Sequence, residues 1–275
     1  NNQKAEVILY RPTGESGDFE KANFPIGVEG GKTSTCPTQN LMEAYDMKDG
    51  TPFVWNNQSN PYDNRDPRMK YTIVCNEMKW PVDPVEIWEG GTNGLPLQNA
   101  TTTGYYLKKY VNNTISFEAG STVTKKQHNW VLFRYGEILL NYAEAMINAF
   151  HDPNYKDAVY NMSAREAVNQ IRGRTNISLP GFPSDITEKD FVKRLKNERR
   201  VELAFEGHRF WDVRRWKELG QTANIYGVKI TKNNEVISYE KFLLETRAVT
   251  DNMYFYPIPN TERFKNPNLG QNPGW

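Results

Sequence analysis

The stretch that most constrains the fold is residues 197–216, NERRVELAFEGHRFWDVRRW, which concentrates charge and aromatic bulk. On a helix at about 100° per residue, its apolar side chains fall on two nearly opposite sides with a charged stripe between them. A helix that is apolar on two sides is usually buried, so the ions of the stripe must be paired. The members of the stripe are Arg199, Glu202, Glu206 and Arg209. We expect a structural ion network in which these side chains pair with one another along one helix.

The same stripe permits a catalytic interpretation, because glycoside hydrolases work with two carboxylates. Retaining enzymes hold these carboxyl groups about 5–5.5 Å apart, a spacing that Glu202 and Glu206 approach on a helix. However, each acid stands beside an arginine, which lowers its pKa, whereas a general acid needs a raised pKa. The structural interpretation is therefore favoured, and it predicts that Glu206→Gln lowers stability and leaves ligand binding nearly intact.

Composition excludes several classes of partner and cofactor. The net charge is +1, from 34 basic and 33 acidic residues that are interspersed, which argues against a nucleic-acid or anionic-membrane partner. Cys36 and Cys75 make no metal cluster, and whether they pair stays open. The three histidines are too scattered for a zinc site, and the sequence carries no nucleotide-binding loop or nucleophile elbow, so we expect no cofactor and no metal.

The chain contains no apolar run of the roughly 18 residues that a membrane-spanning helix needs. It also begins without an initiator Met or a signal peptide. We therefore expect a mature product or, preferably, the later part of a longer protein.

Residues 1–129 are rich in Gly, Pro, Asn, Thr and aromatic residues, and a loop-rich segment of this length is often functional. We expect one short helix over 39–46 and small strands in 7–10, 71–74 and 105–107. Flat rings stack on the C–H faces of sugars while amides and carboxylates bind the hydroxyls, which makes the loop aromatics candidate ligand contacts. These candidates are Trp55, Tyr62, Trp80 and Trp88. Packing in the core or against loops is the alternative for each ring.

Helical periodicity begins near residue 130 and predicts helical hairpins over 130–219. Residues 134–150 place apolar side chains on one helical face. Ser163 opens a second helix with a capping box, and Thr187 caps a third. Gly207 costs about 1 kcal/mol relative to Ala inside a helix, so we expect another backbone to approach closely there, with a helix break as the alternative. Residues 220–275 return to loop, and their Pro-rich, aromatic end predicts an extended strap wrapped over the body.

A series of short motifs runs in order along almost the whole chain. In the first half these are Pro37–Tyr45 with Asp49–Gly50, Arg65–Arg68, and Gly104–Tyr105 with Lys108–Tyr110. In the second half they are Arg134–Ala145, Val168–Asn169 with Arg172, Glu198–Trp216, Tyr256–Pro259 and Gln271–Gly274. In this combination the chain resembles the C-terminal part of SusD/RagB-type proteins, the surface nutrient-binding lipoproteins of Bacteroidetes.

The resemblance implies a mainly α fold of tetratricopeptide-like helical hairpins with long irregular loops and a few short strands, the C-terminal portion of a SusD-like fold. The chain then divides into a loop-rich, ligand-facing part (1–129), helical hairpins (130–219), and C-terminal loops with a strap (220–275). In the family, the ligand surface draws partly on loops after the segment that ends at Gly50, where the four candidate rings fall.

The resemblance also implies a location and a partner. The location is the extracellular face of the outer membrane, with attachment only through a lipid anchor that this chain does not contain. The partner is a TonB-dependent, SusC-like outer-membrane transporter.

The favoured function is non-catalytic binding of oligosaccharides or polysaccharides for delivery to that transporter. A helical-repeat scaffold that binds only the transporter, or peptides, is the first alternative. A glycoside hydrolase is the second alternative. Binding without cleavage would favour the first hypothesis, no glycan binding would favour the scaffold, and released sugars would favour the hydrolase.

Overall fold

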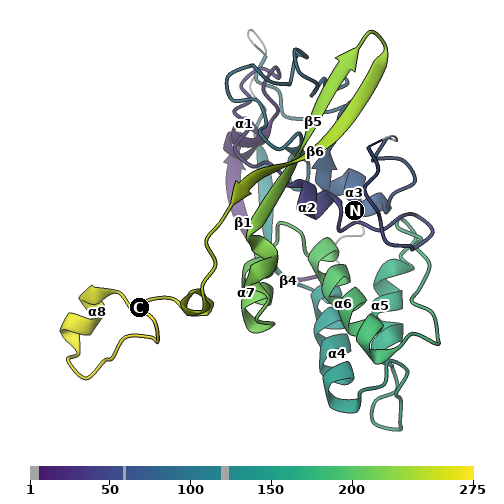
Figure 1. Cartoon of the computed structure of the whole chain (residues 1–275), viewed down its shortest axis with the longest axis vertical. Coiled ribbons are helices and arrows are strands. Elements are labelled where there is room, and N and C mark those ends of the chain that lie inside the picture. Colours follow the sequence, from purple (N-terminus) through teal and green to yellow (C-terminus); the bar gives the residue numbers. More distant parts are fainter. Residues whose placement is uncertain (1–5, 58–59, 119–123) are drawn as a thin grey trace.

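The computed structural model of the chain describes residues 6–57, 60–118 and 124–275. Helix accounts for 30% and strand for 18% of it. Figure 1 shows a helical body, a loop-rich part beside it that is flanked by two-stranded ribbons, and a C-terminal arm that points away from both. The expected helices form the helical body, but helix is less than a third of the structure and the ribbons contribute more strand than the mainly α expectation allows.

The helical body is formed by antiparallel helices that enclose their own core. These helices are α4 (Tyr135–Phe150), α5 (Ala164–Arg172) and α6 (Glu188–Glu202). Leu140, Ile147 and Phe191 are almost fully buried between them, as the apolar periodicity predicts. Each such side chain stabilises the fold by about 1.5–3 kcal/mol.

Both predicted helix starts are confirmed. The Ser163 side chain accepts a hydrogen bond from the backbone of Glu166, and the Glu166 side chain accepts one from the backbone of Ser163. Thr187 accepts a hydrogen bond from the backbone N–H of Asp190. These side chains satisfy N–H groups that the first turn of a helix leaves without partners.

The stretch 197–216 is not one helix, which corrects the expectation from its sequence. α6 ends at Glu202, a turn follows, and α7 (His208–Arg215) begins after Gly207. Gly207 has φ +84°, a left-handed conformation that favours glycine, and no atom lies within 4 Å of where its Cβ would be. The break that was the alternative at Gly207 is therefore confirmed, and the close approach of another backbone is wrong.

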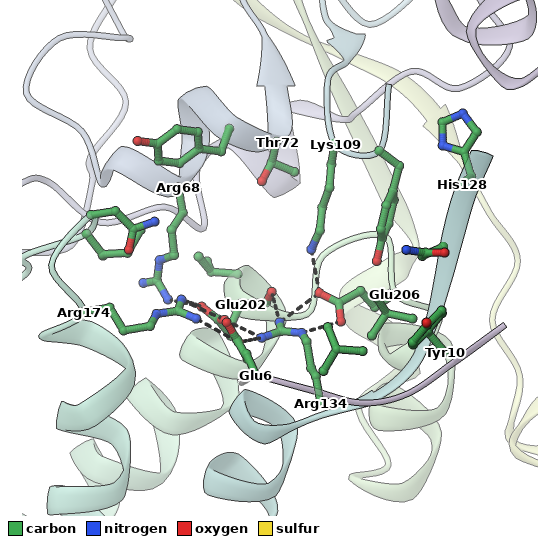
Figure 2. Close-up of a pocket in the computed structure, with 18 of the residues that line it drawn as sticks. Glu6, Tyr10, Arg68, Thr72, Lys109, His128, Arg134, Arg174, Glu202 and Glu206 are labelled. Atoms are coloured by element: carbon green, nitrogen blue, oxygen red, sulfur yellow. Dashed lines mark hydrogen bonds and ion pairs between the residues drawn. The ribbon is translucent and has the colours of Figure 1, made fainter. Parts of the chain in front are cut away.

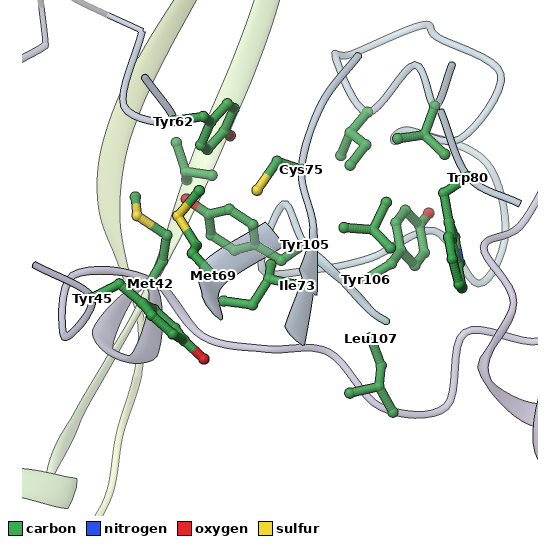
Figure 3. Packing of buried hydrophobic residues seen from close by; sticks show 14 of the residues in the cluster. Met42, Tyr45, Tyr62, Met69, Ile73, Cys75, Trp80, Tyr105, Tyr106 and Leu107 are labelled. Carbon is green, nitrogen blue, oxygen red and sulfur yellow. The ribbon is translucent and has the colours of Figure 1, made fainter. Parts of the chain in front are cut away.

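The loop-rich part has a second core, built from short elements (Figure 3). These elements are α1 (Asp18–Asn23), α2 (Gln39–Met42), α3 (Pro67–Thr72), β2 (Ile73–Val74) and β3 (Tyr106–Leu107). The helix expected over 39–46 is thus shorter than predicted. Of the strand expected over 71–74, only Ile73–Val74 is strand, because Tyr71 and Thr72 end α3, while the strand expected over 105–107 is present as Tyr106–Leu107. Met42, Tyr45, Met69, Ile73 and Tyr105 are fully buried here. The many irregular segments between these elements are held by this apolar interior rather than by regular backbone pairing.

Two ribbons flank this core. β1 (Val7–Ser16) pairs antiparallel with β4 (Lys126–Arg134), and β5 (Asn224–Asn233) pairs antiparallel with β6 (Val236–Thr246). The β5–β6 hairpin corrects the expectation that residues 220–275 are loop throughout. It is anchored by Val228, Ile230 and Tyr239, whose side chains join the core of the loop-rich part.

The β1–β4 ribbon is far less covered. Within it, only Arg134 is buried. Leu9 is 55% exposed, Tyr10 49% and Trp130 48%, so apolar side chains of both strands face solvent.

The C-terminal arm does not wrap over the body as a strap, so that expectation is wrong. It holds a 3-10 helix (Asp251–Tyr254) and α8 (Asn260–Lys265), and no residue after Tyr239 is buried. Its ring contact with the body is made by Tyr256, which stacks on Phe210 of α7 with ring centroids 5.8 Å apart. Figure 1 shows the arm leaving the β5–β6 hairpin and pointing outward.

Candidate functional site

The ion network gathers around Glu202, the last residue of α6. Its carboxylate accepts hydrogen bonds from Arg68 at 2.9 Å, Arg134 at 2.8 Å and Arg174 at 2.7 Å. The Glu202 side chain is only 3% exposed, so these guanidinium groups replace the water that it loses. The three arginines come from α3, from the end of β4 and from the segment after α5, and the network therefore joins three distant parts of the chain.

Glu206 and Glu198 extend the network on either side of Glu202. Glu206 accepts from Arg134 at 2.7 Å and from Lys109 at 2.6 Å. Glu198 accepts from Arg172 at 2.7 Å and also from Arg68. Figure 2 shows Arg134 between the Glu202 and Glu206 carboxylates, with Arg174 on the side of Glu202 and Lys109 on the side of Glu206.

The predicted partners within the stripe are not the ones that the structure uses. Arg199 pairs with Asp212 of α7 at 2.8 Å, and Arg209 donates to the side chain of Gln221. Because the helix breaks after Glu202, the side chains of the stripe do not follow one helical face. A structural ion network exists, but it pairs Glu202 and Glu206 with cations of other segments, and Arg209 stands outside it.

The electrostatics of the network do not suit acid catalysis. Burial opposes ionisation of Glu202, but the charges of Arg68, Arg134 and Arg174 outweigh it and hold its pKa far below the ordinary range. Burial likewise opposes ionisation of Glu206, and its bonds to Arg134 and Lys109 lower its pKa. A general acid for glycoside hydrolysis needs a raised pKa, which neither carboxyl group has.

An open cleft of about 970 Å³ lies above the network (Figure 2). Tyr10 and Tyr71 line its rim and are 49% and 56% exposed. Gln127, Asn129 and Asn176 add amide groups to the lining. The sequence did not single out these residues, because Tyr10 and Tyr71 lie in or beside expected strands and nothing in the local pattern marks their exposure.

Two of the four predicted ligand rings are core residues. Tyr62 is 6% exposed and packs edge-on against Tyr105 and Tyr239, with ring centroids 6.2 and 5.3 Å away. Trp80 is 7% exposed, and the Lys108 ammonium lies 5.0 Å from its ring centroid. Figure 3 shows Tyr62 and Trp80 at opposite ends of the same core. Their burial leaves no ring face for a sugar, which corrects the expectation for both and favours the packing alternative.

The other two rings keep part of their surface exposed. Trp55 packs edge-on against Phe53, with centroids 6.4 Å apart, and its indole N–H donates to the side chain of Asn57. Trp88 has the Lys232 ammonium 4.5 Å from its ring centroid. Both rings are half-buried against the edge of the loop-rich core, in irregular segments with polar neighbours. They remain candidate ligand contacts.

Metals and disulfides each require a particular arrangement of side chains. Among the described residues, no group of three or more His, Cys, Asp or Glu side chains could hold a metal ion. Cys36 and Cys75 are both free thiols, and burial raises the pKa of each. Within the described ranges, no helix is both long enough and apolar enough to cross a membrane.

Comparison with known proteins places these features in a family. A model of the SusD family matches residues 6–275. SusD-like protein P2 of Formosa agariphila is 29% identical over 163 residues, which are 57% of this chain and 28% of that protein. SusD-family glycan-binding proteins are non-catalytic, in agreement with the electrostatics of Glu202 and Glu206.

Solved structures match over nearly the whole chain. A SusD-like protein from Bacteroides fragilis superposes with a TM-score of 0.79 and 26% identity, covering 98% of this chain. A SusD-like carbohydrate-binding protein from the same species gives a TM-score of 0.75 and 25% identity over 96% of this chain. In both matches, the chain spans 54% of the length of the solved relative.

Proposed function

Because the chain belongs to the SusD family, we propose that it binds oligosaccharides or polysaccharides without cleaving them. The observation that carries this proposal is its likeness, over 96% of its length, to a SusD-like carbohydrate-binding protein with 25% identity. The described residues agree with it, since they offer half-buried rings in polar loops and a pair of carboxylates that is held by arginines and a lysine.

Within this proposal, Trp55 and Trp88 are the ligand-stacking residues. Each ring packs against the loop-rich core and keeps part of its surface exposed, so it is already ordered before a ligand arrives. Asn57, which holds the Trp55 indole by a hydrogen bond, adds a polar group at the edge of that ring. The irregular segments that carry both rings are typical of recognition loops positioned by a rigid scaffold.

The proposal extends to location and partner. We propose that the protein works at the extracellular face of the outer membrane, where a TonB-dependent, SusC-like transporter receives the glycan. Membrane attachment would be through a lipid anchor. The support for this part is family membership alone.

Affinity electrophoresis on a panel of neutral and acidic glycans tests the proposal, followed by calorimetric titration of the best ligand. Trp55→Ala and Trp88→Ala are each expected to weaken binding about tenfold, because each removes stacking area worth about 1.4 kcal/mol. Trp211→Ala is the matched control, since Trp211 is a 59% exposed tryptophan on α7, away from the loops. No binding to any glycan would contradict the proposal and favour a scaffold that binds only the transporter. Released sugars would contradict its non-catalytic part.

A further inference from the structure

A groove separate from the cleft of Figure 2 lies between α6 and the loop that follows α2. Its volume is about 470 Å³. The cationic side chains that line it are Lys189, Lys193, Arg194, Lys196, Arg200 and Arg209. The acidic ones are Glu43, Asp46 and Glu218. Cations therefore outnumber acids two to one along this groove, in a chain whose net charge is only +1.

The acids of the groove are already engaged by particular cations. Glu43 accepts from Lys241 at 2.8 Å, and Glu218 accepts from Lys196. Asp46 lies 3.4 Å from the buried guanidinium of Arg172. These pairs leave positive charge in the groove without a matching carboxylate.

The unmatched charge sits on arginines that are held only by neutral groups. Arg200 donates one N–H to the carbonyl of Asn40 at 2.8 Å, and Arg209 donates one to the side chain of Gln221 at 2.8 Å. Across the described ranges, no carboxylate lies within 4 Å of either guanidinium. Arg194 donates to the carbonyl of Gly50 and has Asp46 only at 3.9 Å.

The arginines elsewhere in the interior provide a contrast within the same chain. Those of the network around Glu202, and Arg199 beside it, each have a carboxylate within 3.4 Å. Buried Arg65 has none, but both of its terminal nitrogens donate to backbone carbonyls. An arginine that loses water without gaining a carboxylate is costly, and two such charges side by side repel each other. Burial, and secondly the charge of Arg209, lowers the pKa of Arg200 to about 10. An anion in the groove would relieve both effects.

A purely structural role accounts for part of this arrangement. Arg200 and Asn197 donate to the carbonyls of Asn40 and Ala44 and so tie the loop to α6. That role uses only one nitrogen of the Arg200 guanidinium. Arg209 likewise uses one nitrogen, which donates to the side chain of Gln221. The other nitrogens of both groups have no acceptor among the described side chains and backbone, which leaves a planar set of donors suited to an oxyanion.

An aromatic rim adjoins these donors. Phe53 lines the groove, and Trp55 packs edge-on against Phe53. We propose that the groove binds the carboxylate or sulfate group of an acidic glycan through Arg200 and Arg209, beside a sugar that stacks on Trp55. This inference rests on the proposed function, because it names the class of glycan that the chain captures.

Calorimetric titration of the 275-residue chain tests the groove. The probes are an oligogalacturonate, a sulfated oligosaccharide, a neutral gluco-oligosaccharide of equal length, and sodium sulfate. At low ionic strength, the acidic glycans are expected to bind about tenfold more tightly than the neutral one, and added salt should narrow the difference. Sodium sulfate should compete with the acidic glycans for the groove. If sodium sulfate alone binds as tightly as they do, the groove recognises the anion; if it binds more weakly, the sugar also contributes.

Variants then locate the anion. Arg209→Gln and Lys193→Gln are each expected to weaken binding of acidic glycans about fivefold and to leave the neutral glycan unchanged. Neither residue ties the loop to α6, so equal thermal melts should accompany the loss. Lys229→Gln is the matched control, because it removes one positive charge from β5, where Lys229 faces Glu89.

The outcomes separate the two proposals. The proposed anion site in the groove is wrong if acidic glycans bind no better than neutral ones. It is also wrong if Arg209→Gln and Lys193→Gln both leave the affinity for acidic glycans unchanged. In either case the proposal of glycan binding stands. If no glycan binds, the proposed function falls together with this inference.

Discussion

Glu202→Gln is the change that tests the ion network most directly. Glutamine keeps the volume of the side chain and one carbonyl oxygen, but it removes the negative charge and turns an amide NH₂ toward guanidinium groups. Arg68, Arg134 and Arg174 would then share a site from which their common carboxylate is gone.

The structure sets the size of the effect. Removing one partner of a buried ion pair typically costs about 3–5 kcal/mol, because the other charge stays buried. Arg68 is 7% exposed and keeps Asp66 and Glu198, while Arg174 is 29% exposed and can recover water. We therefore expect the lower end of that range, a loss of about 3 kcal/mol in the free energy of unfolding.

The effect should depend on pH in a defined direction. The folded-state pKa of Glu202 lies below its unfolded value, so ionised Glu202 stabilises the fold at all pH values above the unfolded pKa. This contribution is lost as the pH falls through the depressed folded value. The difference between the wild type and Glu202→Gln should thus be constant above about pH 5.5 and shrink below about pH 4.

Urea unfolding at pH 7 and at lower pH measures the loss of free energy and its pH dependence. Circular dichroism and tryptophan fluorescence monitor the unfolding. Coincident transitions from the two probes establish that a two-state free energy applies. Glu245→Gln is the control, since Glu245 forms an exposed pair with Arg247 and its loss should leave the free energy unchanged within error. A Glu202→Gln loss below about 1 kcal/mol would refute the reasoning, because it would match a surface pair.

Three further predictions concern the backbone and the thiols. Gly207→Ala should lower the free energy of unfolding by about 1 kcal/mol, because φ is +84° and no clash adds to the conformational cost; an unchanged urea midpoint would contradict this. Ser163→Ala should cost about 1 kcal/mol through loss of the capping box, whereas Ser163→Asp should retain most of it in the same assay. Burial raises the pKa of the Cys75 thiol to about 12, so mass spectrometry should find iodoacetamide on half-buried Cys36 first, with Cys75 labelled only after unfolding.

The helical body could be predicted because its signals are local. The apolar period of α4 and the caps at Ser163 and Thr187 each lie within a few residues of the structure that they specify. The β5–β6 hairpin also had a local signal, since β-branched and aromatic residues flank the turn at Asn234, which has a positive φ. The Pro-rich, aromatic end of the chain nevertheless predicts loop for the whole of 220–275, which conceals the hairpin.

The sequence predicts that the charged side chains of the network are paired, but it does not predict which side chains pair with each other. Arg68 lies 134 residues from Glu202 in the sequence, Arg134 lies 68 and Arg174 lies 28. No periodicity links such positions, so pairing along one helix was the only geometry that the sequence offered. The break at Gly207 then removed even that geometry.

The ligand rings show a similar limit. Trp55, Tyr62, Trp80 and Trp88 have comparable polar surroundings in sequence, yet Tyr62 and Trp80 are buried. Whether a loop ring faces the core or the solvent depends on contacts with remote segments, such as Tyr239 against Tyr62. The neighbouring residues in the sequence therefore identify a region rich in aromatic rings. They do not distinguish rings that could stack on a ligand from rings that pack in the core.

The β1–β4 ribbon has a consequence for the protein in solution. Within the described ranges, no further strand pairs with the outer edge of β1 or of β4. Leu9, Tyr10 and Trp130 are exposed on this ribbon. Such an edge is a template onto which a second molecule can add a strand. Arg11, Pro12 and Glu15 lie in β1 and oppose that addition through charge and a missing N–H. We therefore expect that self-association of this chain at high concentration begins at the ribbon rather than at the helical body.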